Sequence, residues 1–407
     1  MNIVILAGGA SSRFWPFSER KHKSEFIVGG NTILEHTIKN LPQSSNIIVV
    51  TKENSAAKET LRAFNNVTIV TQMEPKGMYD ALVSAKSVLK GDFILMLPHH
   101  FWVKDIIEEL SGKNAPAVVV RKYRDGDEES KGIAAVSNGS VTEIREKQLY
   151  KGATHSVIGV YKLSARIFTD IEKDKEGDEY VFERILNGYA KSGTLSYVEY
   201  EKDTPTLKYV HDLLVYKDKI FGTLSNYKRN AESGSNVFID KSVVMSDDVK
   251  IGNNVSIKGN TFIGCCVVIG DNCLVRDSFL EEGSKIGFNT EVARSIIGRN
   301  THVHSGFIGD SVIGENCRVG ANFISANRRV DRKTINIILR GKKVDTKRTS
   351  FGFVMGDDVH TGINASTMPG TLIGNSCVVG ANTQLIGTIE SKHLVYSKAV
   401  NEIKKLG

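Results

Sequence analysis

The chain has 407 residues, of which 41% are hydrophobic and 24% are charged. This ordinary globular composition excludes a disordered chain, and at ~100–200 residues per domain it predicts two domains. The net charge of +7 suits anionic ligands such as nucleotides and sugar phosphates. Basic residues are scattered and balanced by 46 acidic ones, which excludes a nucleic-acid partner. No apolar run approaches the roughly 20 residues of a membrane span. We therefore expect a cytoplasmic protein with no membrane partner, because the chain opens directly into a strand-like segment.

The first strand is expected at residues 3–6, which are apolar, and small residues follow it. Glycines in such a turn let backbone N–H groups approach a phosphate closely, so Leu6, Gly8 and Gly9 are candidate nucleotide-binding residues. Arg13 offers a rigid fork of donors for phosphate oxygens, and Lys23 adds a mobile positive charge. This layout predicts a triphosphate-binding site. The alternative is an ordinary strand and loop of an α/β domain.

Up to residue 222, short apolar strands alternate with helical segments. This alternation predicts a mostly parallel sheet covered by helices on both faces, with ligands bound outside the carboxyl ends of the strands. The expected strands are 46–50, 67–70, 93–97 and 117–120, and the expected helices are 32–41, 54–64, 78–89 and 103–110.

After residue 236, aliphatic residues or methionine recur at every sixth position. This period is typical of the hexapeptide repeat of a β-helix, in which each unit is one short strand and a turn. We predict a domain at 1–222, a linker at 223–236 and a β-helix at 237–400, interrupted by a long basic loop at 325–350. Such a loop either carries function or is a solvated connector. The first repeat positions are Ile239, Met245, Ile251, Ile257, Ile263, Ile269 and Val275.

All five cysteines lie after residue 260. Their spacing matches no zinc pattern, and an odd count argues against a disulfide framework. We expect small core-filling thiols in a reducing compartment and no metal site. They are Cys265, Cys266, Cys273, Cys317 and Cys377.

Two resemblances together cover essentially the whole chain. Residues 6–9 with Arg13, residues 16–18 and Lys23 resemble the signature of the sugar-1-phosphate nucleotidyltransferases. The repeat resembles the left-handed parallel β-helix of hexapeptide acyltransferases. The combination is similar to the bifunctional archaeal sugar-1-phosphate nucleotidylyltransferase and amino-sugar-1-phosphate acetyltransferase. This resemblance implies an N-terminal Rossmann-like α/β domain, a C-terminal left-handed β-helix, and a homotrimer or higher oligomer with sites between subunits.

For the first domain, the resemblance implies attack of a sugar 1-phosphate on the α-phosphorus of a nucleoside triphosphate. It makes Arg13 and Lys23 the catalytic residues that steady the triphosphate. It assigns base reading to Gln72 and places Gly77, in the run 74–77, before the base-binding loop. Gly132, Glu146 and Lys147 match the sugar-phosphate segment. For Glu146 and Lys147 alone, a solvated charged pair is the alternative.

The first domain also departs from the family. The family's counterpart of strand 93–97 ends in Gly-Asp, and that aspartate holds Mg²⁺; here the strand leads into Pro98, His99 and His100. By resemblance, the family's second Mg²⁺-binding aspartate aligns near residues 207–209, and none of these residues in this chain has a carboxylate. Because Mg²⁺ prefers carboxylate oxygens, we expect weak or absent nucleotidyl transfer, with Mg²⁺ used only if transfer survives. Adjacent loop histidines are otherwise expected to be exposed, or to bind a softer metal.

For the second domain, acetyl transfer from a thioester to an amine needs a general base and a group that holds phosphate. By resemblance, His304 is the base, Asn327 contacts the substrate or acetyl-CoA, and Lys333 binds a phosphate. Segment 351–370 resembles the stretch whose backbone meets acetyl-CoA. Phe307 replaces the family's tyrosine. The alternative for His304 is a turn histidine on a β-helix.

Three functions stay open at this point. The first is acetyl-CoA-dependent N-acetylation of an amino-sugar 1-phosphate in nucleotide-sugar biosynthesis, beside a nucleotidyltransferase domain of altered activity. The second is a non-catalytic regulatory subunit that senses a nucleotide sugar and pairs with an active paralogue. The third is a plain guanylyl-, uridylyl- or thymidylyltransferase with an oligomerising β-helix. All three imply a nucleoside triphosphate or nucleotide sugar, and a sugar 1-phosphate, as ligands.

Overall fold

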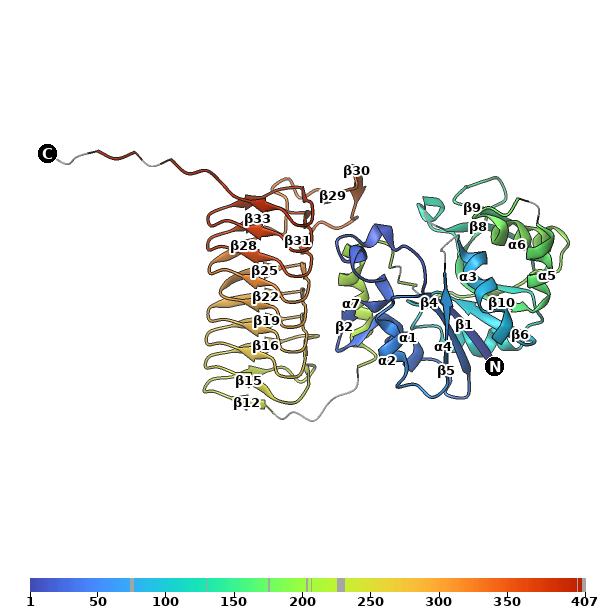
Figure 1. Ribbon diagram of the computed structural model, residues 1–407, viewed down its shortest axis with the longest axis horizontal. Coiled ribbons are helices and arrows are strands. Elements are labelled where there is room, and N and C mark those ends of the chain that lie inside the picture. Colours follow the sequence, from blue (N-terminus) through green and yellow to red (C-terminus); the bar gives the residue numbers. More distant parts are fainter. Residues whose placement is uncertain are drawn as a thin grey trace. The chain divides into compact units, whose positions relative to one another are not determined.

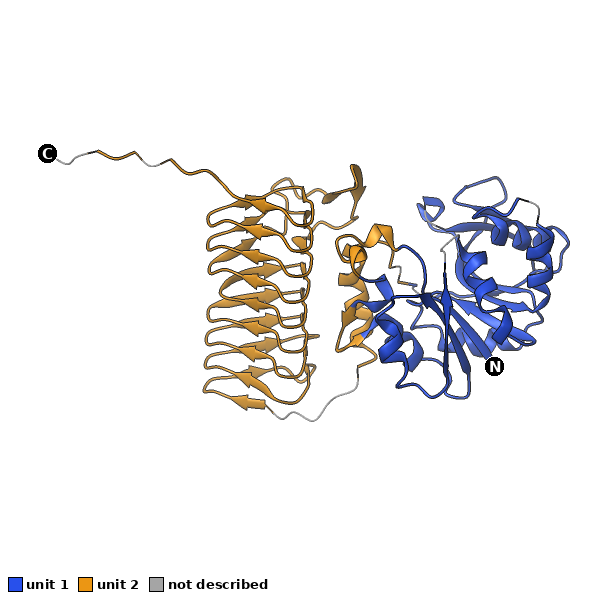
Figure 2. Ribbon diagram, viewed as in Figure 1, with its two compact units in different colours: residues 1–10, 21–26, 32–204 blue, residues 11–20, 27–31, 205–407 orange. Residues whose placement is uncertain are grey.

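The computed structural model describes residues 1–73, 77–129, 131–174, 176–202, 204–205, 207–224, 231–400 and 402–404. It divides into two compact units (Figure 2). Unit 1 holds residues 1–10, 21–26 and 32–204, and unit 2 holds residues 11–20, 27–31 and 205–407. The predicted domain boundaries at residues 222 and 237 stay predictions, and residues 225–230 of the predicted linker lie outside the described residues.

A mixed sheet with the order β5-β4-β1-β6-β10-β7-β11-β9-β8 forms the centre of unit 1 (Figure 1). β1 is parallel to β4 and β6, and β4 is parallel to β5, as predicted around the first strand. β10 runs antiparallel to β6 and β7, and β8 pairs antiparallel with β9. The strands are β1 (Asn2–Leu6), β4 (Asn46–Lys52), β5 (Val67–Gln72), β6 (Asp92–Met96), β7 (Ala117–Lys122), β8 (Gly132–Ser137), β9 (Ser140–Glu146), β10 (His155–Ser164) and β11 (Ser196–Glu199).

Helices cover both faces of this sheet because alternate strand residues point to opposite sides. Val4 and Leu6 pack with α3, α5 and α6, whereas Ile3 and Ile5 pack with α1, α2 and α4. The helices are α1 (Ile33–Lys39), α2 (Ala57–Leu61), α3 (Met78–Ser84), α4 (Lys104–Ser111), α5 (Arg166–Lys173) and α6 (Val181–Lys191), with short 3₁₀ turns η3 (Lys23–Glu25), η4 (Lys86–Val88) and η5 (Asp127–Glu129). In the described residues, no helix is long and apolar enough to cross a membrane.

The C-terminal part of unit 2 is a β-helix, which confirms the hexapeptide prediction. Within the described residues three parallel sheets form its sides, and the chain visits them in turn. Sheet 1 contains β12 (Ala231–Ser233), β15 (Val249–Ile251), β18 (Val268–Ile269), β21 (Lys285–Ile286), β24 (His302–Val303), β27 (Arg318–Val319), β32 (His360–Thr361), β35 (Val378–Val379) and β38 (Leu394–Val395). Sheet 2 contains β13 (Phe238–Ile239), β16 (Ser256–Lys258), β19 (Leu274–Arg276), β22 (Thr290–Ala293), β25 (Gly306–Gly309), β28 (Phe323–Ser325), β33 (Ser366–Thr367) and β36 (Gln384–Leu385). Sheet 3 contains β14 (Val244–Met245), β17 (Phe262–Ile263), β20 (Phe279–Leu280), β23 (Ile296–Ile297), β26 (Val312–Ile313), β31 (Phe353–Met355), β34 (Thr371–Ile373) and β37 (Thr388–Ile389).

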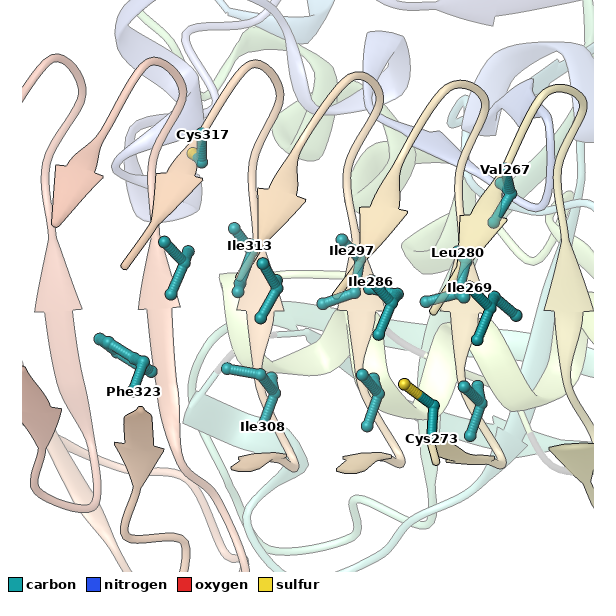
Figure 3. Close-up of a cluster of buried hydrophobic side chains, with 14 of the residues drawn as sticks. Val267, Ile269, Cys273, Leu280, Ile286, Ile297, Ile308, Ile313, Cys317 and Phe323 are labelled. Atoms are coloured by element: carbon teal, nitrogen blue, oxygen red, sulfur yellow. The ribbon is translucent and has the colours of Figure 1, made fainter. Parts of the chain in front are cut away.

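Stacked aliphatic side chains fill the interior of the β-helix (Figure 3). In sheet 1, Ile251 lies beside Ile269, Ile269 beside Ile286, and Ile286 beside Val303. The turns are tight enough to need left-handed residues, and asparagine supplies many of them because it tolerates positive φ. Asn254 and Asn272, for example, both have a φ of 57°.

Two expectations about the β-helix were wrong in part. Segment 325–350 is not simply a loop, because it contains an antiparallel hairpin of β29 (Asn336–Leu339) and β30 (Lys342–Asp345). Its inward residues Ile337 and Leu339 are buried. Cysteines 273, 317 and 377 fill the core as expected, but Cys266 is exposed and Cys265 is half-buried. Both lie at a turn of a coil rather than at an inward strand position.

Unit 2 also contains segments from the N-terminal part of the chain. The carbonyl of Pro16 accepts a hydrogen bond from the side chain of Asn375 at 2.8 Å. The backbone N–H groups of Gly29 and Gly30 donate to the Glu281 carboxylate at 2.7 and 2.9 Å. These segments include η1 (Ser12–Phe14), η2 (Phe17–Glu19) and β2 (Ile27–Val28), which pairs with β3 (Asn31–Thr32), and the later η6 (Val210–Asp212) and α7 (Leu213–Phe221) also belong to unit 2.

Candidate active sites

The predicted nucleotide-binding residues of unit 1 meet at one edge of its sheet. β1, β4, β5 and β6 are parallel, so their carboxyl ends share that edge. Leu6 ends β1, Gln72 ends β5, and Gly8 and Gly9 follow β1 directly. A Cβ atom added to Gly8 would lie 2.4 Å from Oε1 of Gln72, so the glycine and the glutamine are in close contact.

Gln72 is held in place rather than mobile. Its side chain is buried, and Nε2 donates to a carboxylate oxygen of Asp80, on α3, at 2.8 Å. The amide therefore has a fixed orientation next to the glycine turn, as a base-reading side chain requires. Sequence reasoning missed Asp80, because a single aspartate in the first turn of a helix carries no special pattern.

The charge of Lys23 acts on three histidines, His22, His99 and His100. Burial lowers the pKa of His22 and of His100 to about 3, and the nearby charge of Lys23 acts in the same direction. Burial also lowers the pKa of His99 well below its ordinary value, again with Lys23 as the next cause. The expectation that His99 and His100 are exposed is wrong, since they are 7% and 3% exposed. The His100 ring packs against His99 and Trp102, at centroid distances of 4.6 and 5.2 Å.

These neutral imidazoles change the chemistry of the site. The charge of Lys131 also lowers the pKa of His100, so lysines on two elements act on this histidine. Mg²⁺ binds carboxylate oxygens, and a buried neutral imidazole next to cationic groups is a poor substitute. The side chains after β6 therefore do not fit the Mg²⁺ ion that the family resemblance implies.

The predicted sugar-phosphate residues also lie together in unit 1. Gly132 pairs with Glu146 across β8 and β9, and a Cβ on Gly132 would lie 3.2 Å from a Glu146 carboxylate oxygen. Lys147 forms an ion pair with Glu146 at 3.2 Å, and its backbone N–H donates to the carbonyl of Lys131 at 3.1 Å. The predicted sugar-phosphate segment is therefore hydrogen-bonded to the backbone of Lys131, the lysine whose charge lowers the pKa of His100.

Other predicted residues are less clearly grouped. Gly77 has a φ of 116°, and a Cβ there would lie 3.4 Å from the Cα of Glu179. Tyr79, beside it, donates a hydrogen bond to the carbonyl of Gly177 at 3.0 Å. Residues 74–76 of the predicted run lie outside the described residues. Arg13 belongs to unit 2, where its side chain is exposed on η1.

His304 lies on the outer surface of the β-helix in unit 2. It follows β24 and is exposed. Its ring centroid is 6.3 Å from that of His302, with nearly parallel planes, and 6.3 Å from that of Phe288. An exposed imidazole can accept a proton from a bound amine, as a general base must.

His302 lines an open basic cavity of about 400 Å³, and His304 is not part of that lining. Lys285, His302 and Arg318 contribute its basic side chains, and Gly283, Asn300 and Asn316 complete the lining. Burial lowers the pKa of His302, and Arg318 and His304 act in the same direction. The two cations and the polar lining suit an anionic ligand such as a phosphate or pyrophosphate.

Asn327 belongs to a network that sequence reasoning missed. Its amide nitrogen donates a hydrogen bond to the buried carboxylate of Asp310 at 2.5 Å. Arg294 donates two hydrogen bonds to the same carboxylate, at 2.8 and 2.7 Å. Phe307 lies over Gly309, since a Cβ added there would be 2.6 Å from the ring. The Gly-Asp pair at 309–310 is the signal in the sequence that could have pointed to Asp310, whereas no pattern points to Arg294.

The structure does not bring His304, Asn327 and Lys333 into one cluster within a single chain. His304 lies just before β25, whereas Asp310, the hydrogen-bond partner of Asn327, lies just after it. A strand of four residues spans ~13 Å, which is too far for one small group to contact both ends. Lys333 is exposed on the excursion, where its backbone N–H donates to Asp331 at 3.3 Å.

Comparison with known proteins agrees with this architecture. Residues 2–205 match the family model described as nucleotidyl transferase, and residues 234–344 match the GMPPB C-terminal domain. The fold and these matches define a transferase of nucleotide-sugar biosynthesis, and the chain belongs to the nucleotidyl transferase family. The family implies a nucleotide and a sugar 1-phosphate as substrates.

Full-length relatives share both parts. The chain is 30% identical to the bifunctional protein GlmU of Methanococcus vannielii and 29% identical to that of Methanocaldococcus jannaschii, with 100% of each chain covered. It is 27% identical to the bifunctional sugar-1-phosphate nucleotidylyltransferase/acetyltransferase of Sulfurisphaera tokodaii, over 92% of this chain and 94% of that protein. The predicted family resemblance is therefore confirmed.

Proposed function

We propose that unit 2 transfers an acetyl group from acetyl-CoA to the amino group of an amino-sugar 1-phosphate. The observation that carries this proposal is the basic cavity lined by His302, whose ring centroid lies 6.3 Å from that of His304, and this cavity suits the phosphates of coenzyme A. The amine attacks the thioester carbonyl while the His304 imidazole takes its proton. The new C–N bond forms, the C–S bond breaks, and the thiolate of coenzyme A leaves and is protonated.

Asn327 and Lys333 are proposed to bind the acceptor. Asn327 is fixed by Asp310, whose carboxylate is in turn held by Arg294. Lys333 is exposed and offers a mobile ammonium to the sugar phosphate. Phe307 contributes an apolar ring where the family has a hydroxyl, so the acceptor meets one hydrogen-bonding group fewer.

We further propose a homotrimer in which neighbouring copies complete the acetyl-transfer site. The support is the separation of His304 from the Asp310–Asn327 pair by the whole of β25. In light scattering after gel filtration, the expected mass is three times the 44.7 kDa of one chain. A monomer that still acetylates would contradict this part of the proposal.

Unit 1 is proposed to bind a nucleoside triphosphate or nucleotide sugar, and a sugar 1-phosphate, with weak or absent nucleotidyl transfer. Gly8, Gly9 and Gln72 would meet the nucleotide, with Lys23 on its phosphates and Gly77 at the base-binding loop. The triphosphate role of Arg13, which belongs to unit 2, stays a prediction. Gly132, Glu146 and Lys147 would hold the sugar phosphate. The support for low activity is the buried, neutral His100, whose pKa is lowered by burial and further by the charges of Lys23 and Lys131.

A regulatory subunit that senses nucleotide sugars is the second candidate. Two observations favour it: the uncharged side chain of His100 at the end of β6, and the Phe307 ring in the acetyl-transfer motif. Such a protein would bind nucleotide and sugar phosphate without turnover. A plain nucleotidyltransferase is the third candidate, and it requires Mg²⁺-dependent pyrophosphate release.

The deciding experiment measures thiol release from acetyl-CoA with a panel of amino-sugar 1-phosphates, beside pyrophosphate release from nucleoside triphosphates. We expect thiol release with at least one acceptor, and its loss in His304→Ala. His393→Ala is the matched control, since His393 is an exposed histidine that directly precedes β38 of the same sheet and lies outside segment 351–370. Absence of thiol release with every acceptor, or full activity of His304→Ala, would overturn the acetyltransferase proposal.

A further inference from the structure

Asp248, Cys265 and Cys266 place three potential ligand atoms together on the outside of the β-helix. Asp248 lies in the turn between β14 and β15, and the two cysteines lie in the equivalent turn of the next coil, between β17 and β18. One ligand atom from each residue lies within 4.8 Å of the other two. The two sulfur atoms are 3.2 Å apart.

The backbone of the β-helix holds this arrangement. Asp248 and Cys266 occupy corresponding left-handed positions, each with a φ of 59°. The N–H of Cys266 donates to the carbonyl of Asp247 at 3.3 Å, and the carbonyl of Cys265 accepts from Gly283 at 2.9 Å. The donor atoms are thus attached to stacked turns of a ladder, which limits their freedom before any ligand binds.

Ions in solution can reach these side chains. Asp248 and Cys266 are exposed, and Cys265 is half-buried. The charged groups that act on Cys265 besides its neighbour are the carboxylates of Asp248 and Glu282, both negative. The local field therefore attracts cations.

The donor set selects a thiophilic cation. Two thiolates with one carboxylate match the preferences of Zn²⁺ and its heavier analogue Cd²⁺, whereas Mg²⁺ and Ca²⁺ take oxygen ligands. A tetrahedral zinc ion with Zn–S bonds of ~2.3 Å holds two sulfurs ~3.8 Å apart. The thiols therefore need to separate only slightly, by small side-chain rotations, to reach that geometry.

We propose that Asp248, Cys265 and Cys266 bind one thiophilic divalent cation of the zinc group, with water as the fourth ligand. Binding displaces the thiol protons and forms two metal–sulfur bonds and one metal–oxygen bond, with no change of oxidation state. Because the ligands come from successive coils, the ion ties the first turns of the β-helix together. Terminal coils of such repeats lack a neighbour on one side, so a cross-link there stabilises the exposed end.

This site is separate from the acetyl-transfer and nucleotide-binding residues, and its test does not depend on either activity.

The test is a titration of the reduced full-length chain with Cd²⁺, followed by the ultraviolet thiolate-to-cadmium absorption band. We expect one equivalent to bind and the melting temperature to rise with Cd²⁺ or Zn²⁺. In Cys265→Ser and Cys266→Ser the affinity should fall at least as far as the ~10–100-fold typical for loss of an outer-shell partner. Asp248→Asn should weaken binding with the band retained.

The matched control is Asp247→Asn, which alters the neighbouring exposed acid of the same turn and leaves the three ligand atoms in place. It should bind Cd²⁺ like the parent. No absorption band, an unchanged affinity in Cys266→Ser, or equal losses in Asp247→Asn and Asp248→Asn would each overturn the proposal. The melting temperature without metal shows that each variant is folded.

Discussion

The side-chain amide of Asn375 donates a hydrogen bond to the carbonyl of Pro16 at 2.8 Å, across 359 positions of the sequence. Asn375 is buried near the C-terminal end of the β-helix, and its own oxygen accepts from the N–H of Asp357 at 2.8 Å. The same amide nitrogen also donates to Glu19 at 2.9 Å. The β-helix therefore holds the segment that carries Arg13.

Replacing this amide should loosen the Arg13 segment. In Asn375→Ala the carbonyl of Pro16 loses its buried donor, and a buried hydrogen bond contributes ~1 kcal/mol net. We expect hydrogen exchange in residues 11–20 to accelerate roughly 2–10-fold. Gln384→Ala, which removes an exposed amide from the same end of the β-helix, is the control and should leave exchange unchanged. Equal protection in Asn375→Ala and the parent would show that other contacts hold the segment.

The glycine turn after β1 offers a paired test of nucleotide binding. In Gly8→Ala the new Cβ would lie 2.4 Å from Oε1 of Gln72, so the amide must move by about 1 Å to reach ordinary contact. We expect nucleoside triphosphate affinity to fall by roughly tenfold, about 1.4 kcal/mol, in isothermal titration.

Gly188→Ala, on α6, is the control for this variant, because nothing outside its own helix backbone lies within 4 Å of its added Cβ and Gly188 is not a predicted nucleotide-binding residue. It should bind nucleotide nearly as well as the parent. If Gly8→Ala weakens nucleotide binding by displacing Gln72, the same substitution should cost less affinity in a Gln72→Ser background. Similar affinities for the two alanine variants would contradict the role given to Gln72.

Restoring a carboxylate at the end of β6 should raise nucleotidyl transfer. In His100→Asp the new side chain would lie near Lys23 and Lys131, whose charges favour the ionised carboxylate that Mg²⁺ needs. We expect Mg²⁺-dependent pyrophosphate release to increase by about tenfold or more, equivalent to ~1.4 kcal/mol of barrier. His99→Asp places the same group one residue earlier and should show no such gain. A folded His100→Asp protein without added activity would mean that His100 is not what limits transfer.

Glu281 should make the stability of unit 2 depend on pH. Burial raises the pKa of its carboxyl to about 7 from 4.5. Below pH 4.5 both folded and unfolded states are protonated, and the stabilising effect is fully present. Between 4.5 and about 7 only the folded state keeps the proton, so stability is lost as the pH rises, by about 3 kcal/mol in all.

The measurement is the melting temperature of the parent minus that of Glu281→Gln, from pH 4 to 9. This difference should fall as the pH rises from 4.5 to about 7 and stay constant at higher pH, because the glutamine does not titrate. Glu232→Gln, which removes an exposed carboxylate of β12, is the control for the loss of a carboxyl group from unit 2. A constant difference for Glu281→Gln would mean that its carboxyl titrates at an ordinary pKa.

Much of the architecture could be read from local patterns. The strand at residues 3–6, the alternation up to residue 222 and the six-residue period after 236 each reflect how a short segment buries one side, so they are visible without the rest of the chain. The glycine turn was predictable for the same reason, since Gly8 and Gly9 follow a strand directly. The contact of Gly8 with Gln72 then follows from parallel strands that end at one edge.

The sequence by itself thus determined the family, the two-part fold and the candidate residues on each strand end. Only the tertiary structure decided which groups are buried together: His100 next to Trp102, Asp310 held by Arg294 and Asn327, and Asn375 on Pro16. The physical reason is that burial and charge at a side chain depend on residues from distant elements, which no local period encodes. Two adjacent histidines on a loop therefore suggested exposed rings, and packing against other strands made them buried and neutral.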